Sequence, residues 1–180
     1  MQRFDIQNIF ASFSLDSTID VENLSKEFTK SIYDPQLSPS LEIRDDEHGI
    51  VFRVFNTGQV TCLGGKSENE VRSGIRTFLE KLKQKNYIIS TDVKVEISNY
   101  VATLNFGKRI RMWKAAYFLK GSKYNCHRLP WLIYESEKPK VLFHIFENGK
   151  IICTGAQNRR EILAAFKALK TQLKENSLWY

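Results

Sequence analysis

The hydrophobic and polar positions of this chain predict the same series of strands and helices twice. Residues 4–13 and 94–104 alternate with a period of two, which indicates strands with one buried face. Helical spacing follows each of them, at residues 20–31 (Val21, Leu24, Phe28) and at residues 110–120 (Ile110, Trp113, Ala116, Phe118). Short strands are then expected at residues 40–44, 50–55, 59–63, 131–135, 141–146 and 150–154.

A longer amphipathic helix is predicted at the end of each series. Ser67 with Glu70 has the three-residue spacing of a capping box, and Asn158 with Glu161 repeats that spacing. The apolar stripes that follow are Val71, Ile75, Phe78, Leu79 and Leu82, and later Ile162, Phe166, Leu169 and Leu173. The last two strands of each series are joined through Asn-Thr-Gly and Glu-Asn-Gly, whose glycines allow the positive φ of a tight hairpin.

The two series are copies of one another at a constant offset of 91 residues. The stretch FNTGQVTCLGG, residues 55–65, returns as FENGKIICTGA, residues 146–156. The same offset, without a gap, pairs Ile6 with Ile97, Asn8 with Asn99, Tyr33 with Tyr124, Pro39 with Pro130, Leu41 with Leu132, Glu70 with Glu161 and Leu82 with Leu173. We therefore predict a tandem duplication, with one repeat at residues 1–91 and the other at residues 92–180.

The order strand, helix, three strands, helix in each repeat predicts an α+β fold. Two such repeats would share one antiparallel sheet about a pseudo-twofold axis, with the helices on one face. The other face of the sheet would stay open, and it is the place where a binding function is expected.

Charge is distributed unevenly between the repeats. The net charge is +7, and residues 1–90 carry −2 whereas residues 91–180 carry +9. A basic half of this kind favours a nucleic acid or a phosphate-rich partner, with a merely solvated basic surface as the alternative. No apolar run approaches the 18 residues of a membrane span, and the polar N-terminal residues do not fit a secretory signal, so an intracellular protein is expected.

The sequence offers no pattern for catalysis or metal binding. Cys62, Cys126 and Cys153 are odd in number and form no Cys-x-x-Cys pair, so reduced thiols are expected. The three histidines are scattered without ligand spacing, and neither a nucleophile–base pair nor paired carboxylates stand out. We predict a protein without a metal or cofactor that is not an enzyme.

The repeat resembles the core domain of the TATA-box-binding protein family over residues 4–175. The motifs that carry the resemblance are Gln7-Asn8-Ile9, Ser98-Asn99-Tyr100-Val101, Tyr33-Asp34-Pro35, Leu132-Ile133-Tyr134, Phe55 through Gly64-Gly65-Lys66, and Phe146 through Gly155-Ala156. The resemblance implies a saddle with a curved antiparallel sheet, helices on the convex face and a concave face that binds the minor groove of A·T-rich DNA. It also implies a monomer on double-stranded DNA that nucleates transcription initiation with IIB-like and IIA-like factors and RNA polymerase.

The resemblance also implies roles for individual residues. The minor-groove surface would consist of Asn8, Phe10, Ser12, Thr61, Leu63, Asn99, Val101, Thr103, Ile152 and Thr154. The side chains that wedge between base steps would be Phe55, Leu129 and Phe146, and the phosphate contacts would be Arg44, Lys66 and Lys150. Asn8 and Asn99 could donate to adenine N3 and thymine O2, the acceptors on the floor of the groove.

Several residues depart from the family pattern. Ser38 stands where a wedge phenylalanine is expected, and since a hydroxymethyl group offers little apolar contact, a weaker kink is predicted at that end. Arg53 and His144 replace leucines, and Glu135 replaces a basic residue. The loop Asn125-Cys126-His127-Arg128 lacks the acidic residues that bind factor IIB in the family.

Other interpretations stay open at this point. Phe55 and Phe146 could be core residues, Asn8 and Asn99 could stabilise turns, and the basic stripe Arg159, Arg160, Lys167, Lys170 and Lys174 could be plain surface. Cys62 and Cys153 are expected to be buried. The main alternative function is a divergent scaffold for protein partners with weak DNA binding. The expected location is the nucleus, or the cytoplasm for an archaeal protein, or association with a virus.

Overall fold

The computed structural model describes residues 3–90 and 92–180, which form two compact units. The first unit contains residues 8–98, and the second contains residues 99–180 together with the start of the chain up to Gln7. The predicted ends of the repeats at residues 1 and 91 lie outside the described residues.

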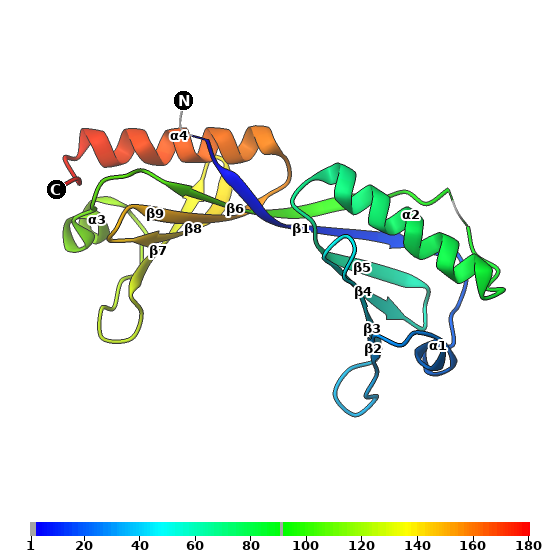
Figure 1. Ribbon diagram of the computed structural model, residues 1–180. Coiled ribbons are helices and arrows are strands. Elements are labelled where there is room, and N and C mark those ends of the chain that lie inside the picture. Colours follow the sequence, from blue (N-terminus) through cyan, green and yellow to red (C-terminus); the bar gives the residue numbers. More distant parts are fainter. Residues whose placement is uncertain (1–2, 91) are drawn as a thin grey trace. The chain divides into compact units, whose positions relative to one another are not determined.

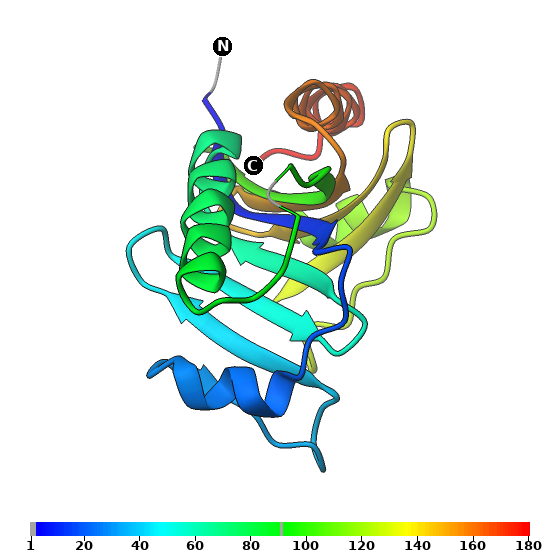
Figure 2. The same cartoon turned by 90° about the vertical axis from the view of Figure 1, so that its right-hand side faces the viewer.

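The first unit is an antiparallel sheet with two helices. In chain order its elements are β1 (Asp5–Ser14, of which residues 8–14 belong to this unit), α1 (Val21–Glu27), β2 (Ser31–Ile32), β3 (Ser40–Asp45), β4 (Ile50–Phe55), β5 (Gln59–Gly64) and α2 (Glu68–Gln84). The strands lie in the order β2-β3-β4-β5-β1. Within the unit, α2 crosses one face of the sheet and α1 lies near its outer strands (Figures 1 and 2).

The second unit repeats this arrangement. Its elements are β6 (Glu96–Asn105, of which residues 99–105 belong to this unit), α3 (Met112–Phe118), β7 (Trp131–Glu137), β8 (Lys140–Phe146), β9 (Lys150–Ala156) and α4 (Arg159–Glu175). The strand order is β6-β9-β8-β7, and α4 covers one face (Figure 1). The bridge between Lys123 and Ile133 stands 91 residues after the pair Ile32–Glu42 of β2 and β3.

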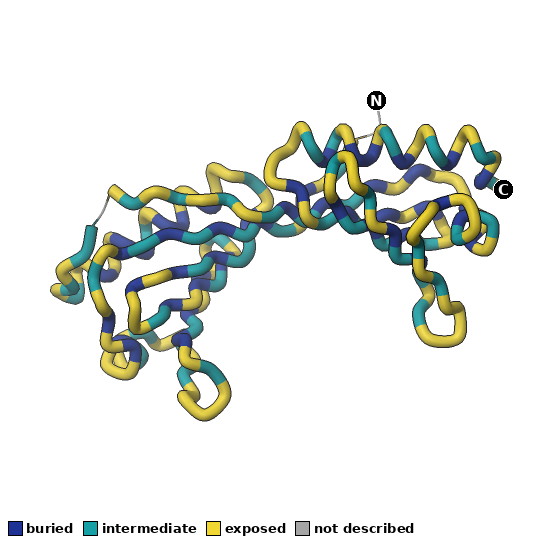
Figure 3. Tube along the Cα trace, turned by 180° about the vertical axis from the view of Figure 1, so that it is seen from behind, coloured by how far each residue is buried: buried dark blue, intermediate teal, exposed yellow. Residues whose placement is uncertain are grey.

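Each helix-covered face holds an aromatic core. The ring of Phe78 in α2 stacks on Phe52 with centroids 4.4 Å apart and lies edge-on to Phe13 at 6.5 Å. The equivalent residue of α4 is Leu169, and here Phe166 contacts Phe143 at 6.0 Å instead. Along most of each long strand buried residues alternate with half-exposed or exposed ones (Figure 3), so burial of one face fixes the strand register.

The starts of both long helices follow the predicted capping pattern. The Ser67 hydroxyl accepts from the Glu70 backbone N–H at 3.2 Å, and the Asn158 side chain accepts from the Glu161 N–H at 2.9 Å. In return the two glutamates accept from the backbone N–H of Lys66 at 2.7 Å and of Gln157 at 2.8 Å. Each start is thus held by two hydrogen bonds between residues three or four apart, one of which satisfies a free N–H of the helix, so the helix starts are locally determined.

The hairpin glycines also match their prediction. Gly58 and Gly149 have φ of 81° and 86°. A Cβ atom on Gly58 would lie 2.0 Å from the Ser17 carbonyl oxygen, and one on Gly149 would lie 2.3 Å from the Lys108 carbonyl oxygen. Both the conformation and the space therefore require glycine.

The predicted strands are confirmed to within about two residues, a normal uncertainty for element ends. The two short helices are shorter than predicted, since α1 ends at Glu27 and α3 at Phe118. The Ser31 hydroxyl follows the first one and lies within hydrogen-bond distance of two carbonyl oxygens, those of Ser25 at 2.8 Å and Phe28 at 2.7 Å.

The apolar face assigned to the second short helix was wrong. Met112 and Ala115 are its buried residues, whereas Trp113 and Phe118 are exposed and Ile110 is buried before the helix begins. Among the described residues, no helix combines the length and the apolar character needed to cross a membrane.

Candidate nucleic-acid interface

The face of each sheet that α2 or α4 does not cover is lined by half-exposed side chains, and we call it the open face of that unit. All ten predicted groove residues are half-exposed, and their neighbours in the strands, such as Ile9, Ala11, Ala102 and Cys153, are buried. The ten residues share this face because a period of two sends alternate side chains to opposite faces, and their role toward DNA stays a prediction.

Strand register brings these residues together within each unit. In the first unit Phe10 lies opposite Leu63, and Ser12 lies opposite Thr61. The next strand adds Val51 beside Leu63 and Arg53 beside Thr61.

In the second unit Val101 lies opposite Thr154, and Thr103 lies opposite Ile152. These rows extend to Leu142 and His144 on β8. Val51 and Leu142 were missed as members of the open face, although the alternation of residues 50–55 and 141–146 contained the signal.

Asn8 and Asn99 hold the same backbone position in both units. The side-chain oxygen of Asn8 accepts the Gly64 N–H, and that of Asn99 accepts the Gly155 N–H, each at 2.6 Å. The register of β6 with β9 skips Gly155, so the amide oxygen satisfies an N–H that the ladder leaves out.

Because the side-chain oxygen of each asparagine already accepts a backbone N–H, the side-chain nitrogen is the atom that can bind a ligand. The Asn99 nitrogen donates to the Thr154 hydroxyl at 3.1 Å, on the open face. The interpretation of these residues as turn stabilisers and their interpretation as groove donors are therefore compatible. The side-chain oxygen does the first, and the NH₂ group has two N–H donors, so that of Asn99 keeps one for the second beside its bond to Thr154.

At the outer end of the first unit, the aromatic wedge candidate has polar neighbours. Phe55 is half-exposed and lies opposite Ser40 on β3. The Ser38 and Ser40 hydroxyls lie 2.8 Å apart, and the Ser38 hydroxyl accepts the Ser40 N–H at 3.2 Å. Ser38 thus serves the local turn and supplies no apolar partner for Phe55.

At the outer end of the second unit, Phe146 stands in an aromatic group. It lies opposite Trp131 on β7, whose ring centroid is 5.7 Å from Phe146 and 5.8 Å from His144. Leu129 is half-exposed two residues earlier. Trp131 was missed by sequence reasoning. The signal was its difference from the small residue Ser40, its counterpart at the offset of 91. The indole Nε1 of Trp131 is buried and has no hydrogen-bond partner among the described residues.

The residues predicted to contact phosphate are all exposed, but they differ in whether a carboxylate of the protein already pairs with them. Arg44 pairs with Glu42 at 3.3 Å, and Arg53 lies 3.6 Å from the same carboxylate. Lys66 and Lys150 are exposed at a strand end and a hairpin. Glu135 is exposed and lines a hollow of about 690 Å³ that includes Lys120 and Lys140, so the second unit also holds an acid near its basic residues.

The cysteines of the two repeats lie in the same environment. Cys62 and Cys153 are buried, and burial raises the pKa of each thiol to about 12. Their expected burial is confirmed, and both thiols stay protonated at neutral pH.

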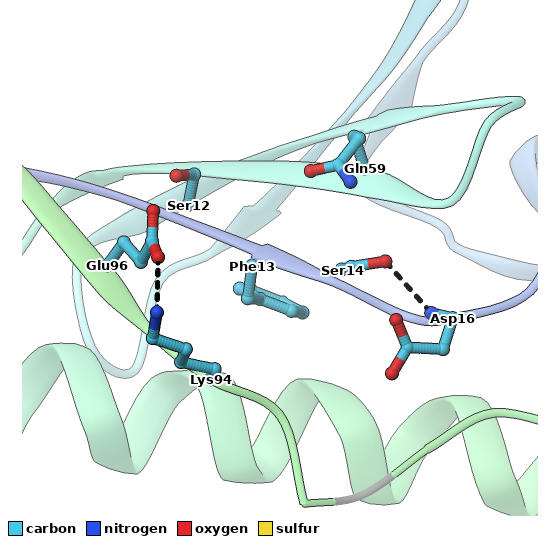
Figure 4. A pocket seen from close by; sticks show the side chains of 7 residues that line it. All are labelled: Ser12, Phe13, Ser14, Asp16, Gln59, Lys94 and Glu96. Carbon is cyan, nitrogen blue, oxygen red and sulfur yellow. Dashed lines mark hydrogen bonds and ion pairs between the residues drawn. The ribbon is translucent and has the colours of Figure 1, made fainter.

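Two other clusters in the first unit are satisfied by their own neighbours. A hollow of about 270 Å³ beside Ser12 contains Lys94 and Glu96, which form an ion pair at 2.9 Å that raises the pKa of the lysine and lowers that of the glutamate (Figure 4). Asp45, Glu47 and His48 offer ligand atoms within 4.8 Å of one another, a grouping that the scattered histidines did not predict. Asp45 already accepts from His48 at 2.7 Å and lies 4.0 Å from the Lys81 ammonium.

Along its whole length the chain is similar to proteins of one family. The family model "Transcription factor TFIID (or TATA-binding protein, TBP)" matches residues 3–85 and 94–176. A TATA-box-binding protein of Pyrobaculum aerophilum is 32% identical over 177 residues, which cover 98% of this chain and 89% of that protein. One from Sulfolobus acidocaldarius is 30% identical over 171 residues, covering 95% and 87%.

A solved structure, that of Methanococcus jannaschii TBP, gives a TM-score of 0.89 at 27% identity, over 96% of this chain and 99% of the other. The α+β tandem-repeat fold predicted from the sequence is thereby confirmed.

Proposed function

The chain belongs to the TATA-binding protein family, and we propose that it binds the minor groove of A·T-rich promoter DNA through the open faces of both units. This family is one of transcription factors and is not an enzyme class. The observation that carries the proposal is the matched chemistry of the two open faces. Each has one asparagine amide held by a glycine N–H and two rows of small or apolar side chains.

That chemistry suits the minor groove. Its floor presents the same acceptors for A·T and T·A pairs, so a few donors with an apolar surface suffice to read it. Asn8 and Asn99 supply the donors, and residues such as Phe10, Leu63, Val101 and Ile152 supply the apolar surface.

We propose that Phe55 and Phe146, with Leu129, enter base steps and bend the duplex. TATA-binding proteins are themselves an established example of this mode, in which each unstacked step costs a few kcal/mol. Since Trp131 contacts Phe146 while the small residue Ser40 lies opposite Phe55, the second repeat would make the stronger kink. Lys66, Lys150 and Arg44 would contact phosphates, which makes binding depend on salt.

On DNA the chain would act as a monomer whose two repeats form one domain, and would recruit IIB-like and IIA-like factors and RNA polymerase. The loop at residues 125–128 lacks acidic residues, so a IIB-like partner would have to carry altered contacts. The archaeal relatives are compatible with the cytoplasmic alternative for its location.

Fluorescence anisotropy on a short TATA duplex and on its scrambled twin, at two salt concentrations, tests the proposal. Wild type should prefer the TATA duplex, and Phe146→Ala should lose most of that preference. A matched control is Tyr117→Lys, which changes an exposed residue away from the open face. Equal, salt-sensitive binding of both duplexes by all three proteins would mean that the basic surface binds phosphate alone.

One observation favours a second candidate, a scaffold whose open face binds protein. Glu42 and Glu135 place carboxylates beside the open faces, where they repel phosphate, and Glu42 already occupies Arg44 and Arg53. A stoichiometric protein partner that excludes the TATA duplex in size-exclusion chromatography would support the scaffold and contradict DNA binding.

A further inference from the structure

Helix α3 of the second unit exposes a group of aromatic side chains that the open face does not use. Trp113 is 67% exposed, Tyr117 82% and Phe118 42%, and Tyr180 beside the helix is 67% exposed. We call these four residues the α3 aromatic surface. Exposed apolar patches usually mark interaction sites, so the clustering of these rings on one short helix indicates a binding partner.

The first repeat shows that the fold does not require these rings. At the offset of 91, α1 carries Glu22, Lys26 and Glu27 where α3 carries Trp113, Tyr117 and Phe118. Both helices bury the same two positions, Val21 and Leu24 in α1 and Met112 and Ala115 in α3. A polar outer surface is therefore sufficient for this helix to pack, and the aromatic surface is an addition of the second repeat.

The charge around the two helices is opposite. Residues 106–134 contain seven basic residues and no acidic one, namely Lys108, Arg109, Arg111, Lys114, Lys120, Lys123 and Arg128. The matching residues 15–43 contain six acidic residues and two basic ones. Within the described part of the chain, Arg109 is the member of the basic set that forms an ion pair, with Glu147. The other basic side chains lack carboxylate partners there, so the surface is complementary to an acidic ligand.

The geometry of the rings favours a protein over a stacked base. Tyr117 and Phe118 meet edge to face at 82°, and Trp113 meets Tyr124 at 71°. A cation also lies over the ring of Phe118, with the Lys114 ammonium 5.8 Å from the ring centre.

Tyr180 has Arg109 and Arg111 at 5.1 and 5.3 Å from its ring centre. Cations therefore lie over the rings of Phe118 and Tyr180, and neighbouring rings meet edge to face and do not form the parallel platform on which nucleobases stack. Aromatic residues mixed with arginine are typical of the centres of protein interfaces.

We propose that the α3 aromatic surface docks an acidic protein segment in which apolar side chains alternate with Asp or Glu. The apolar side chains contact Trp113, Tyr117 and Phe118, and the carboxylates pair with Arg111, Lys114 and Lys123. This docking goes beyond DNA binding, because none of these residues belongs to the open face of the second unit.

A fluorescein-labelled peptide of sixteen residues, alternating Glu or Asp with Leu or Phe, tests the proposal by anisotropy. A second peptide with glutamine in place of every acid serves as the charge control. Wild type should bind the acidic peptide saturably, with an affinity that falls with salt, and should bind the glutamine peptide at least about tenfold more weakly.

The test variant Trp113→Glu with Tyr117→Lys gives α3 the residues that α1 has at the same positions, and should weaken peptide binding at least about tenfold. Tyr117→Lys alone keeps the contact of Trp113 with Tyr124 and should weaken binding by a smaller factor. The matched control, Glu22→Gln with Lys26→Gln on α1, should change nothing.

The TATA duplex is measured with every variant, so that failure of docking and failure of DNA binding are distinguished. Unchanged DNA affinity with lost peptide binding supports the proposal. No saturable binding of the acidic peptide by wild type overturns it. Unchanged peptide binding by the double variant with lost DNA affinity also overturns it and assigns the surface to DNA.

Discussion

The outer ends of the two open faces are copies at the offset of 91, and they differ in what surrounds the phenylalanine that we propose as a wedge. Phe146 has Trp131 against its ring, and Trp131 in turn contacts His144 and follows Leu129 by two residues in the sequence. Phe55 has Ser40 opposite and Ser38 in a hydroxyl-bonded turn. Both phenylalanines stand at the same place in their strands, so the backbone kept its geometry while the side chains around it changed.

The cores of the two repeats changed much less. Each keeps a buried cysteine, a hairpin glycine against a carbonyl oxygen, an asparagine bonded to a glycine N–H and a capped long helix. Packing and backbone hydrogen bonds constrain these positions in both copies, whereas a solvent-facing position is constrained only by its ligand. The comparison thus separates residues that the fold needs from residues that a ligand would select.

The largest expected effect is the difference in thiol reactivity between the exposed Cys126 and the two buried cysteines. Because Cys62 and Cys153 lie in the two cores, equal protection of both would show that the cores are alike. With a pKa of about 12, Cys62 and Cys153 are almost wholly protonated at pH 8, while Cys126 is exposed. We expect Cys126 to react with a thiol reagent at least about a thousandfold faster than the other two. Mass spectrometry of timed samples checks this, and unequal protection of Cys62 and Cys153 would contradict equivalent cores.

The same thiols give a pH dependence of stability. Their pKa is higher in the folded chain than the ordinary value of 9.0, so unfolding becomes easier as the pH rises from 9.0 toward about 12. The variant Cys62→Ala with Cys153→Ala should lose that part of the alkaline slope in denaturant titrations.

The wedge residues should differ in their effect on DNA affinity. Phe146→Ala should weaken binding to the TATA duplex by about 30-fold, near 2 kcal/mol, and Phe55→Ala by about threefold. The reason is that Phe146 has a rigid aromatic support and Phe55 has none. Anisotropy titrations measure both, with thermal melts as the folding control. Equal losses would show that the surroundings of the phenylalanines do not matter.

The asparagines should separate a structural role from a binding role. In Asn8→Asp and Asn99→Asp the carboxylate still accepts the glycine N–H, so the melting temperature should stay close to that of wild type. DNA affinity should fall about tenfold for each, since the donor is lost and a negative charge faces the groove. For Asn99→Ala we expect a further cost of about 1–2 kcal/mol in the free energy of unfolding, because the Gly155 N–H loses its acceptor.

Restoring an apolar residue should make the two ends more alike. Ser38→Leu gives the first repeat the residue that the second has at Leu129 and should tighten TATA binding by about threefold. A fluorescence-transfer measurement of DNA bending would show a larger bend angle. If Ser38→Leu binds no better than Ser38→Ala, the weak end is not due to missing apolar surface.

The smallest effect is expected from the acid on the first open face. Glu42→Gln releases Arg44 and Arg53, so DNA affinity should rise about twofold and the slope of log K against log salt should steepen by about 0.9 for each new phosphate contact. Titrations at four salt concentrations measure the slope. An unchanged slope would mean that neither arginine reaches the backbone of the DNA.

Prediction from the sequence succeeded where the cause is local or periodic. The caps at Ser67 and Asn158 and the glycines at 58 and 149 depend on contacts a few residues away or on a single φ angle, which the sequence shows directly. Prediction failed for α3, because a seven-residue helix has too few apolar positions to define its buried face, and Trp113 was assigned inward.

The sequence by itself determined the duplication, the α+β order of elements, the family and the face of each strand that stays open. These follow from residue spacing and from the constant offset between copies. Only the tertiary structure showed that Asn8 and Asn99 bond glycines 56 residues away, that Trp131 supports Phe146, and that Glu42 occupies Arg44 and Arg53. Such contacts join residues on different strands, and strand register, which brings them within hydrogen-bond or van der Waals distance, is set by the packing of the whole core.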